Sequence, residues 1–560
     1  MTETDPALPP AIRRLLISRG ILTDAEARAY FNPSLSGLAR GSQLPGISAA
    51  AAVILGCGGK IVVFGDYDCD GICASVIVVK CLRRLNKNVE AFLPERLSEG
   101  YGMSDASVAR MLALHPDVEL VVTVDNGINS LGQIAALKAR GIKVVVTDHH
   151  LPGAELPAAD ALVNPCVDPG AEALPICGAA VAFMLAHELI DTARAQGLYS
   201  GESVAGAMLV LAGLATVTDA MPLTGQNRIF VTQAAKLFAK CAPLGLLRLH
   251  EAAVKDQTAV TYRDFGFALG PRINASGRLA SGVDALELLL TEDDAEAAEY
   301  VNIVDRRNSE RKEIEQRMLE EAMAKVVPAA PSQVIEVPDM CPGAMGVAGI
   351  VASRVMDRIA ADAGLSGGTG AVPVCIVVDG RGSARSPAGI NIRDALESCA
   401  AALEHFGGHA AAAGFSVRPG RIGELRAMLA EYCARSPVAA ARQATQAGRV
   451  EMWLERKDVS IELAGWVERM EPFGEGNPEP LFGLRGVRLS QIRTMGQSGR
   501  HLQFCVDGAS PLRSIWWNHG DREEELRKGS AGTFDIIFNL TLSRYGFEHP
   551  QLRIVDVVAG

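Results

Sequence analysis

The stretch KIVVFGDYDCDGIC, residues 60–73, joins an apolar, β-branched run to three aspartates at alternate positions, Asp66, Asp68 and Asp70. An uninterrupted run of this kind is typical of a strand that is buried on both faces of a parallel sheet. Like charges a few ångströms apart repel, and each raises the pKa of its neighbours. The sequence therefore predicts a strand end at which a positive group lies among three carboxylates.

Two later runs repeat this arrangement of an apolar strand that ends in an acid. VELVVTVD ends in Asp125 and KVVVTD ends in Asp148, and helical patterns such as ASVIVVKCLRRL and SLGQIAALKARG lie around them. The alternation predicts an α/β fold with a parallel sheet covered by helices. Because ligands of such sheets bind beyond the carboxyl ends of the strands, we expect Asp66, Asp125 and Asp148 to share one rim.

The chain is too long for a single hydrophobic core, since 560 residues suit three or four domains. A charged stretch of helix formers predicts a long connecting helix, and AVPVCIVVD and NIRDALESCAAALEHF then predict a strand and a helix of a second α/β unit. Short β-like runs between Gly-rich turns favour a small barrel or sandwich at the end. The predicted boundaries are 1–45 for an N-terminal helical segment, 46–290 for the first α/β domain, 291–326 for the connecting helix, 327–436 for the second α/β domain and 447–560 for the β domain.

Composition narrows the class of protein. The formal charge is 54 − 65 = −11, which argues against a protein coated in positive charge but leaves room for a local basic groove. The first residues lack the apolar core of a secretory signal, and the longest apolar stretch, 205–217, is too short to span a bilayer. The 12 cysteines stand singly, with no CxxC pair. We therefore expect a cytoplasmic protein with reduced cysteines and no membrane segment.

Four segments together supply a set of carboxylates and imidazoles. The segments are GDYDCDG, TVDNGI, TDHHLPG and ATVTDAMPL, and their side chains are Asp66, Asp68, Asp70, Asp125, Asp148, His149, His150 and Asp219. Such ligands suit Mn²⁺ or Mg²⁺ better than Zn²⁺. Two divalent ions would neutralise the repelling carboxylates and hold both the attacking and the leaving oxygen of a phosphoryl displacement. A single Asp at a strand end is usually a turn or cap residue, so the interpretation depends on the combination.

With these motifs the chain resembles the DHH phosphoesterase superfamily, whose name describes the triplet Asp148-His149-His150. Further segments resemble its single-strand-specific 5′ to 3′ exonucleases, namely RLSEGYGMS, LGPRINASGRL, GSARS, FGGHAAAAGFS and EPFGEGNPEPLF. The resemblance implies a DHH catalytic domain, the long helix, a DHHA1 domain that holds the GGH motif, and an OB-fold.

The resemblance also implies roles for individual residues. The implied metal ligands are Asp66, Asp68, Asp70, Asp125, His149 and Asp219, with Asp125 and Asp219 bridging two ions. Asp148 would accept a hydrogen bond that orients His149. His150 would be a catalytic or phosphate-contacting partner, so that Asp125, Asp148 and His150 form the expected catalytic group.

Substrate contacts are expected from several basic and small residues. The candidates are Arg96, Arg272, Arg278, Ser383, Arg385, Gly407, Gly408 and His409. Arginine suits phosphate, and glycine lets a nucleic-acid backbone come close. Each arginine taken alone is more often a structural ion pair, and the GGH segment could be a plain helix-start turn.

The last region combines basic and aromatic side chains in the way that single-strand-binding OB-folds do. Its basic residues are Arg485, Arg488, Arg493 and Arg500, and its aromatic pair is Trp516 and Trp517. Because adjacent strand residues face opposite sides, we expect at least one tryptophan to lie in the core. The chain departs from the family pattern in DMCPGAMGVAGIVASR, where neither Cys341 nor Ala344 provides the usual histidine.

The residues themselves predict a manganese or magnesium site, and the resemblance implies an exonuclease that removes nucleotides from the 5′ end of single-stranded DNA, in recombination and repair. A single-strand-binding protein and other repair proteins are expected partners of a monomer. The nearest alternative is a DHH phosphodiesterase for short oligonucleotides or cyclic dinucleotides, which has little need of a third domain. A non-catalytic DNA-replication scaffold is a further alternative, against which the complete acidic set argues.

Overall fold

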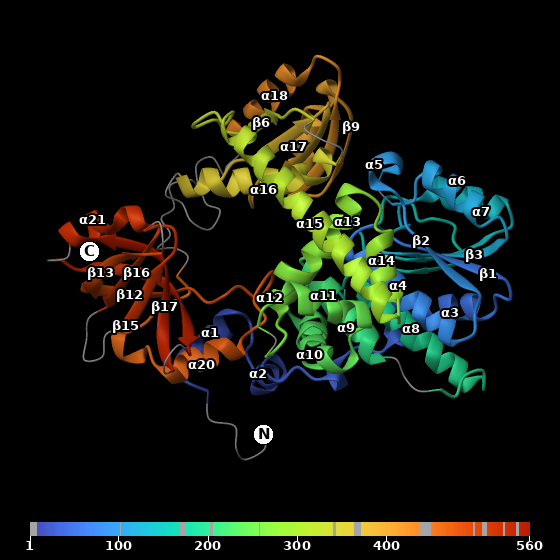
Figure 1. Cartoon of the computed structure of the whole chain (residues 1–560), viewed down its shortest axis with the longest axis horizontal. Coiled ribbons are helices and arrows are strands. Elements are labelled where there is room, and N and C mark those ends of the chain that lie inside the picture. Colours follow the sequence, from blue (N-terminus) through green and yellow to red (C-terminus); the bar gives the residue numbers. More distant parts are fainter. Residues whose placement is uncertain are drawn as a thin grey trace.

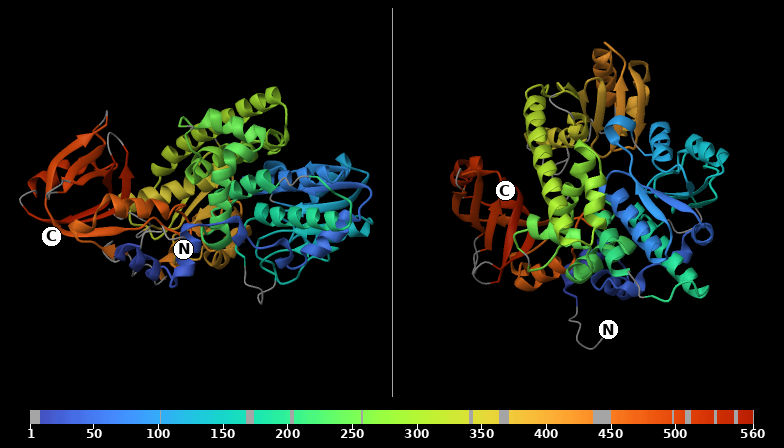
Figure 2. Two further views of the ribbon diagram at one scale, coloured as in Figure 1. Left: turned by 90° about the horizontal axis from the view of Figure 1, so that it is seen from below. Right: turned by 45° about the vertical axis from the view of Figure 1, so that its right-hand side comes forward.

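The computed structural model describes residues 8–559 except 101, 168–173, 202–204, 257, 340–342, 363–370, 436–449, 497–498, 507–511, 530–531 and 545–547. Three sheets follow one another along the chain, and a long helix joins the first to the second (Figure 1). The first and second sheets carry helices on both faces, and the third forms a separate body at one end of the molecule (Figure 2).

The first sheet has the strand order β2-β1-β3-β4-β5, and all its pairings are parallel. Strands β1 (Lys60–Phe64), β3 (Val118–Val124) and β4 (Lys143–Thr147) are the three predicted runs, which confirms the parallel sheet. Strands β2 (Val89–Phe92) and β5 (Ala161–Val163) are short and were not predicted. Because β3 lies between β1 and β4, the carboxyl ends of the three acid-terminated strands are adjacent.

Helices cover both faces of this sheet. On one face α4 (Cys69–Arg84) and α8 (Gly178–Ala195) share a core with β1 and β3, and on the other face α6 (Asp105–Leu114) and α7 (Leu131–Ala139) do so. The longest apolar stretch forms α9 (Ala205–Thr218), which lies buried between α8 and α10 (Gly225–Cys241). Within the described ranges no single helix has the length and apolarity to cross a membrane, although the bent pair Leu35–Gln43 and Ile47–Leu55 does when taken together.

The predicted connecting helix is α15 (Asp294–Met323), which has 30 residues and begins at the side-chain cap Asp293. It packs against α11 (Leu244–Ala253), α13 (Gly270–Leu279) and α14 (Val283–Leu290) of the first domain and against α16 (Ala344–Asp362) of the second. At a rise of about 1.5 Å per residue, it spans roughly 45 Å and sets the spacing of the two α/β domains.

The second sheet has the order β6-β7-β8-β10-β9, with α16 on one face and α17 (Ile392–Ser398) and α18 (Ile422–Arg435) on the other. The bounds of its strands are Gln333–Glu336, Val374–Val378, Arg381–Arg385, Leu403–Gly408 and Ala412–Val417 for β6 to β10. The helix predicted over NIRDALESCAAALEHF is wrong in its second half, because LEHF belongs to β9. Pairing of β9 with β10 outweighs the local helix-forming tendency there.

The third sheet has seven strands in the order β11-β12-β16-β17-β15-β14-β13. Their bounds are Met452–Trp453, Phe482–Val487, Leu489–Met495, His501–Val506, Leu512–Trp516, Phe534–Ser543 and His549–Ala559 for β11 to β17. One tryptophan lies in the core as expected, since Trp516 is 2% exposed and Trp517 is 48% exposed.

The N-terminal helices belong to this third body. Ile12, Leu15 and Leu16 of α1 (Pro10–Ser18) are buried with the β-domain core, which also includes Trp466 of α20 (Ile461–Arg469). Helix α2 (Asp24–Phe31) follows and packs beside it. Two segments separated by more than four hundred residues therefore build one folding unit, which the sequence did not indicate.

A buried polar joint connects this unit to the first domain. The guanidinium of Arg228 in α10 is 3% exposed and donates to the backbone carbonyls of Tyr30, Arg469, Met470 and Glu471 at 2.8–3.4 Å. Asn477, 2% exposed, accepts from Arg19 and Tyr30 and donates to the carbonyls of Met470 and Pro472. The motif EPFGEGNPEPLF therefore forms the contact between the two bodies.

Candidate active site

The carboxyl ends of β1, β3 and β4 bring Asp66, Asp125 and Asp148 to one rim, as the parallel order requires. Asp219 reaches the same rim from the end of α9, where its N–H donates to the carbonyl of Ala215 at 2.9 Å. A contact network centred on His149 then joins strand and helix, because its Nε2 lies 3.0 Å from Asp125 and 3.8 Å from Asp219.

Asp125 occupies the centre of the rim and is 3% exposed. Its φ of 61° lies in the left-handed region, which Asp tolerates better than most residues. Its N–H donates to the carbonyl of Thr147 at 3.1 Å. Gly178 lies so close that an added Cβ would be 2.6 Å from the Cβ of Asp125. Any larger residue at position 178 would displace the central acid.

Asp70 is held by a helix N-terminus. Its two carboxylate oxygens each accept a hydrogen bond of 2.7 Å from the N–H groups of Gly178 and Ala179 in the first turn of α8. The positive end of a helix stabilises a carboxylate in this position. One of those oxygens also lies 3.6 Å from His149 Nε2. The side chain is therefore fixed with a lone pair available toward the rim.

Asp68 and Asp66 each use one carboxylate oxygen in hydrogen bonds to nearby backbone N–H groups. Asp68 is the N-cap of α4, where one oxygen accepts from the N–H groups of Asp70 and Gly71 at 3.0 Å. One oxygen of Asp66 accepts from the N–H of Tyr67 at 2.7 Å. Each residue retains one oxygen that these hydrogen bonds do not use.

The DHH triplet divides its roles differently from the expectation. Asp148, 1% exposed, accepts from His150 Nδ1 at 2.8 Å and from the backbone N–H groups of His149, His150 and Ile128. The ring that Asp148 orients is therefore that of His150, and the prediction that it orients the His149 ring is wrong. The backbone geometry explains this, because the carboxylate caps the loop and only the second ring folds back onto it.

The charge balance of the rim favours a bound cation. Burial, followed by repulsion from neighbouring carboxylates, raises the pKa of Asp125 well above its ordinary range, that of Asp66 to about 7 and that of Asp219 to about 8. Burial lowers the pKa of His149, which keeps its imidazole neutral and able to act as a ligand. These carboxyls would ionise fully at neutral pH only with positive charge among them.

Two groups of side chains have ligand atoms that all lie within 4.8 Å of one another. One is Asp125, His149 and His150, and the other is Asp70, His149 and Asp219. The oxygen Oδ1 of Asp125 is buried and, although His149 Nε2 lies 3.0 Å away, it accepts no hydrogen bond among the described residues, which is the condition of a ligand atom without its ion. The residues present therefore fit Mn²⁺ or Mg²⁺. Asp66 and Asp68 lie outside both groups but interact electrostatically with the rim.

His150 is the charged group that faces outward. Burial opposes its protonation, but the hydrogen bond and the charge of Asp148 prevail and raise its pKa to about 9. Its side chain is 44% exposed, whereas that of His149 is 11% exposed. The rim therefore presents an imidazolium toward solvent at neutral pH.

Helix α13 contacts the loop that carries Asp66 and Asp68, although only its arginines were predicted to act, as substrate contacts. The side chain of Asn274 accepts from the N–H of Cys69 at 2.7 Å, and Gly277 allows the carbonyl of Tyr67 to approach. Arg278 donates to the carbonyl of Gly346 in α16 at 3.1 Å, and burial lowers its pKa to about 10. Because Asn274 has no ionisable group, sequence reasoning about ligands could not single it out.

The arginine candidates of the first domain have different surroundings. Arg272 forms an ion pair with Asp305 of α15 at 2.8 Å and donates to the carbonyl of Ala268, so it fastens two helices together. The guanidinium of Arg96 lies 5.3 Å from the centre of the Tyr67 ring, beside the metal loop. Of the pair, Arg96 is in the better position to reach a phosphate at the rim.

The second-domain candidates gather on two neighbouring strands. Ser383 and Arg385 lie on β8, where Arg385 Nη1 donates to Ser383 Oγ at 3.3 Å, and Gly349 of α16 leaves room for both side chains. Gly407 and Gly408 end β9, and an added Cβ on Gly408 would meet the carbonyl oxygen of Ala412 at 2.4 Å.

His409 follows in the turn between β9 and β10 and is exposed. The GGH segment is therefore a hairpin, not a helix-start turn. Ala344 begins α16, while Cys341 lies outside the described residues.

Comparison with known proteins identifies each of the three bodies. Residues 60–214 match the DHH family, N-terminal domain, residues 343–435 match the DHHA1 domain, and residues 450–556 match the RecJ OB domain. The chain is 34% identical to the single-stranded-DNA-specific exonuclease RecJ of Escherichia coli (strain K12), over 93% of this chain and 92% of that protein.

Solved structures give the same result. The chain matches RecJ from Thermus thermophilus in complex with Mn²⁺ with a TM-score of 0.77 and 30% identity, over 98% of this chain and 78% of that one. It matches the Mg²⁺ complex of RecJ from the same organism with a TM-score of 0.73 and 28% identity, over 98% of this chain and 77% of that one. The predicted order of a DHH domain, a DHHA1 domain and an OB-fold is confirmed.

Proposed function

Because the chain belongs to the RecJ family of single-stranded-DNA-specific exonucleases, we propose that it hydrolyses phosphodiester bonds at one end of single-stranded DNA, at the rim of the first sheet. The observation that carries the proposal is the rim itself, where carboxylates and imidazoles from three strand ends and two helices meet around the unbonded oxygen of Asp125. A scaffold that had lost its chemistry would have no reason to keep carboxylates whose pKa values are raised by burial and, beyond that, by repulsion from one another.

The proposed cofactors are two Mn²⁺ or Mg²⁺ ions. They would be held by Asp70, Asp125, His149 and Asp219, with Asp66 and Asp68 supplying their remaining oxygens. When bound, such ions activate water and neutralise the charge that develops on a phosphate. The related RecJ structures named above contain Mn²⁺ or Mg²⁺.

The protein's own residues would orient the substrate phosphate. The imidazolium of His150, whose Nδ1–H is fixed by Asp148, presents its Nε2–H outward and can donate to a phosphate oxygen. Arg96, at the start of the short helix α5 (Arg96–Glu99), can add a second positive charge. A charge-assisted hydrogen bond that strengthens as the phosphate gains charge favours the transition state over the bound substrate.

We place the 5′ end of the strand against the second domain. Ser383, Arg385 and the hairpin with Gly407, Gly408 and His409 offer a hydroxyl, a guanidinium and a close backbone, a combination suited to a terminal phosphate. Digestion would then proceed from 5′ to 3′. Arg385→Ala should weaken selection for a 5′ phosphate without changing metal binding.

The OB domain would hold the strand that has not yet been cut. Arg485, Arg488, Arg493 and Arg500 are all exposed, and Arg485 lies 4.3 Å from the centre of the Trp453 ring. An oligonucleotide or cyclic-dinucleotide phosphodiesterase would have little use for this surface. We further propose a cytoplasmic monomer that acts in recombination and repair and receives its substrate from a single-strand-binding protein.

The test is digestion of a single strand that carries a different label at each end, with Mn²⁺, with Mg²⁺ and with chelator. Metal-dependent release of the 5′ label first is expected, and Asp125→Ala should abolish it in a folded protein. The matched control is Asp521→Ala, an acid of the β domain outside the rim. Release from the 3′ end, preference for a duplex, or near-parental activity of the Asp125 variant would refute the proposal.

A further inference from the structure

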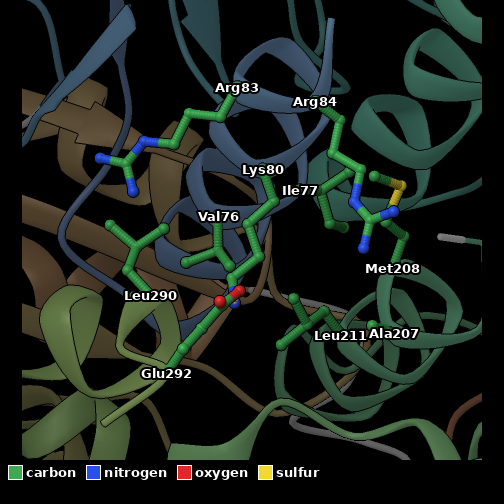
Figure 3. A pocket seen from close by; sticks show the side chains of 10 residues that line it. All are labelled: Val76, Ile77, Lys80, Arg83, Arg84, Ala207, Met208, Leu211, Leu290 and Glu292. Carbon is green, nitrogen blue, oxygen red and sulfur yellow. Dashed lines mark ion pairs between the residues drawn. The ribbon is translucent and has the colours of Figure 1, made fainter. Parts of the chain in front are cut away.

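A cavity of about 560 Å³ lies beside the C-terminal half of α4, away from the catalytic rim (Figure 3). Asp68 caps the N-terminus of α4 at the rim, whereas the cavity is lined by residues 76–84 of the same helix. At about 1.5 Å per residue, its basic residues lie roughly 18–24 Å along the helix from the metal loop. The cavity is therefore separate from the active site.

The floor of the cavity is apolar and comes from three helices. Val76 and Ile77 belong to α4, Met208 and Leu211 to α9, and Leu290 to the end of α14. Their side chains are 0–7% exposed, so they are fixed by packing below the cavity. A rigid apolar floor suits an inserted apolar side chain, because neither surface has to be reorganised on binding.

The edge of the cavity is positive. Lys80, Arg83 and Arg84 all lie on α4, and Figure 3 shows the guanidinium groups of the two arginines on opposite sides with Lys80 between them. Within the described part of the chain neither arginine forms an ion pair within 4.0 Å. The whole chain carries a net charge of −11, so this concentration of cations is a local feature.

Glu292 is the acid among the residues that line the cavity, and Glu287 of α14 lies close enough to interact electrostatically with Arg83. Glu292 forms an ion pair of 3.7 Å with Lys80, and its side chain is 89% exposed. Because Glu292 is exposed and the separation is long, the ion pair is weak, and another carboxylate could replace Glu292 on Lys80. Glu292 therefore occupies, through a weak ion pair, the position on Lys80 that a carboxylate of a ligand could take.

A structural explanation covers only part of this arrangement. Basic residues in the last turn of a helix offset the negative end of its dipole, and arginine stems often cover apolar surface. Those effects do not account for a cavity between the two guanidinium groups.

The spacing of the cations selects the kind of ligand. Consecutive residues of a helix point about 100° apart, so Arg83 and Arg84 cannot both close on one phosphate. They can bind two separate acidic groups that flank an apolar one. An extended peptide with acids on both sides of a bulky apolar residue matches this arrangement. Its apolar residue suits the apolar floor, and its acids suit the two arginines on opposite sides of the cavity.

We propose that this cavity is the docking site for an acidic, apolar-anchored segment of a protein partner. The apolar side chain of the segment enters the floor near Met208 and Leu290. Flanking carboxylates pair with Arg83 and Arg84, and a further carboxylate replaces Glu292 on Lys80.

The test uses the full-length protein and a fluorescein-labelled peptide with the sequence Glu-Asp-Leu-Asp-Glu, followed by fluorescence anisotropy. The comparison peptide is Glu-Asp-Ser-Asp-Glu, which keeps the charge and loses the anchor. Arg83→Glu with Arg84→Glu should weaken binding at least about tenfold. Its matched control is Lys236→Glu with Lys240→Glu, two lysines of α10 outside the cavity.

Two further variants separate the contributions of charge and anchor. Glu292→Gln should strengthen binding by about two- to fivefold, because it removes the internal competitor. Ala207→Phe, at a half-buried position lining the cavity, should fill the cavity and abolish the preference for the peptide with Leu over the one with Ser. Exonuclease activity on a naked single strand should be unchanged in every variant.

Three results would overturn the proposal. The first is equal binding of the Leu and Ser peptides to the parent protein. The second is displacement of the peptide by inorganic phosphate or a mononucleotide at equal charge, which would make the cavity a phosphate site. The third is loss of naked-strand cleavage in the Arg83/Arg84 variant, which would place these arginines on the path of the DNA.

Discussion

Replacing Asp219 by Asn should stabilise the metal-free protein while impairing cleavage. In the folded chain, burial and the charges of Asp70 and Asp68 raise the pKa of Asp219 from 3.8 to about 8. The carboxylate is thus costly in the fold without its ions, and an amide of the same shape removes that cost. The same change removes a ligand atom from one of the two candidate metal groups.

The magnitude follows from linkage. Each tenfold change in proton affinity is worth about 1.4 kcal/mol, so a pKa that rises from 3.8 to about 8 corresponds to roughly 5–6 kcal/mol at full ionisation. Solvent reaches 29% of the Asp219 side chain, and screening should reduce the effect to about 2–3 kcal/mol. The cost is absent below about pH 4, where both states are protonated, and grows up to about pH 8, where the folded carboxyl also ionises.

The assay is urea unfolding of the chelator-treated parent and Asp219→Asn proteins at several pH values between 4 and 9, followed by the same series with Mn²⁺. The stability advantage of the variant should widen as the pH rises through this window and should shrink or reverse with Mn²⁺. Asp521→Asn, an acid outside the rim, is the matched control. An advantage that does not depend on pH, or a metal-free variant less stable than the parent at pH 8, would refute the electrostatic reasoning.

Three other changes test separate parts of the molecule. Asp148→Asn removes the charge that raises the pKa of His150 to about 9, so the alkaline limb of the pH profile of kcat should move to lower pH. An alkaline limb that does not move would exclude His150 as the protonated group. Arg228→Met breaks four hydrogen bonds to backbone carbonyls and should lower the free energy of unfolding by about 3 kcal/mol. An unchanged urea midpoint would contradict a rigid joint. Replacing the exposed arginines Arg488, Arg493 and Arg500 by Ala should make the slope of log binding constant against log salt concentration shallower, by about one unit per lost phosphate contact, for a long single strand. An unaltered slope would show that this surface does not contact the DNA backbone.

The sequence predicts the rim because parallel topology makes it almost unavoidable. Three buried runs that each end in Asp are expected to lie parallel with their carboxyl ends at one edge of the sheet. In the structure β1, β3 and β4 are neighbours, so Asp66, Asp125 and Asp148 meet there. The sequence does not reveal how Asp70 is held. The N–H groups that bind it belong to Gly178 and Ala179, more than a hundred residues away in a helix whose first turns carry no polar side chain.

Other features stayed hidden because they depend on tertiary pairing. LEHF has the composition of a helix end, but its pairing with β10 makes it a strand. Helices α1 and α2 are short amphipathic segments, and nothing in them indicates that their apolar faces pack on a β domain at the other end of the chain. The roles within Asp148-His149-His150 depend on which ring folds back, and this is decided by backbone geometry.

The way the bodies are joined limits which experiments can separate their functions. Removing the residues after 447 would expose Ile12, Leu15 and Leu16 and leave the guanidinium of Arg228 without Met470 and Glu471, so the remaining chain would lose stability for reasons unrelated to DNA. Point changes on the exposed face of the β domain avoid this. Helix α13 presents the same problem at the other joint. Asn274 binds the N–H of Cys69 beside the candidate ligands Asp68 and Asp70, while Arg278, one turn later, binds α16 of the second domain. A shift of that one helix would move the candidate metal ligands and the proposed 5′-phosphate pocket together, which would preserve the distance between the strand end and the bond that is cut.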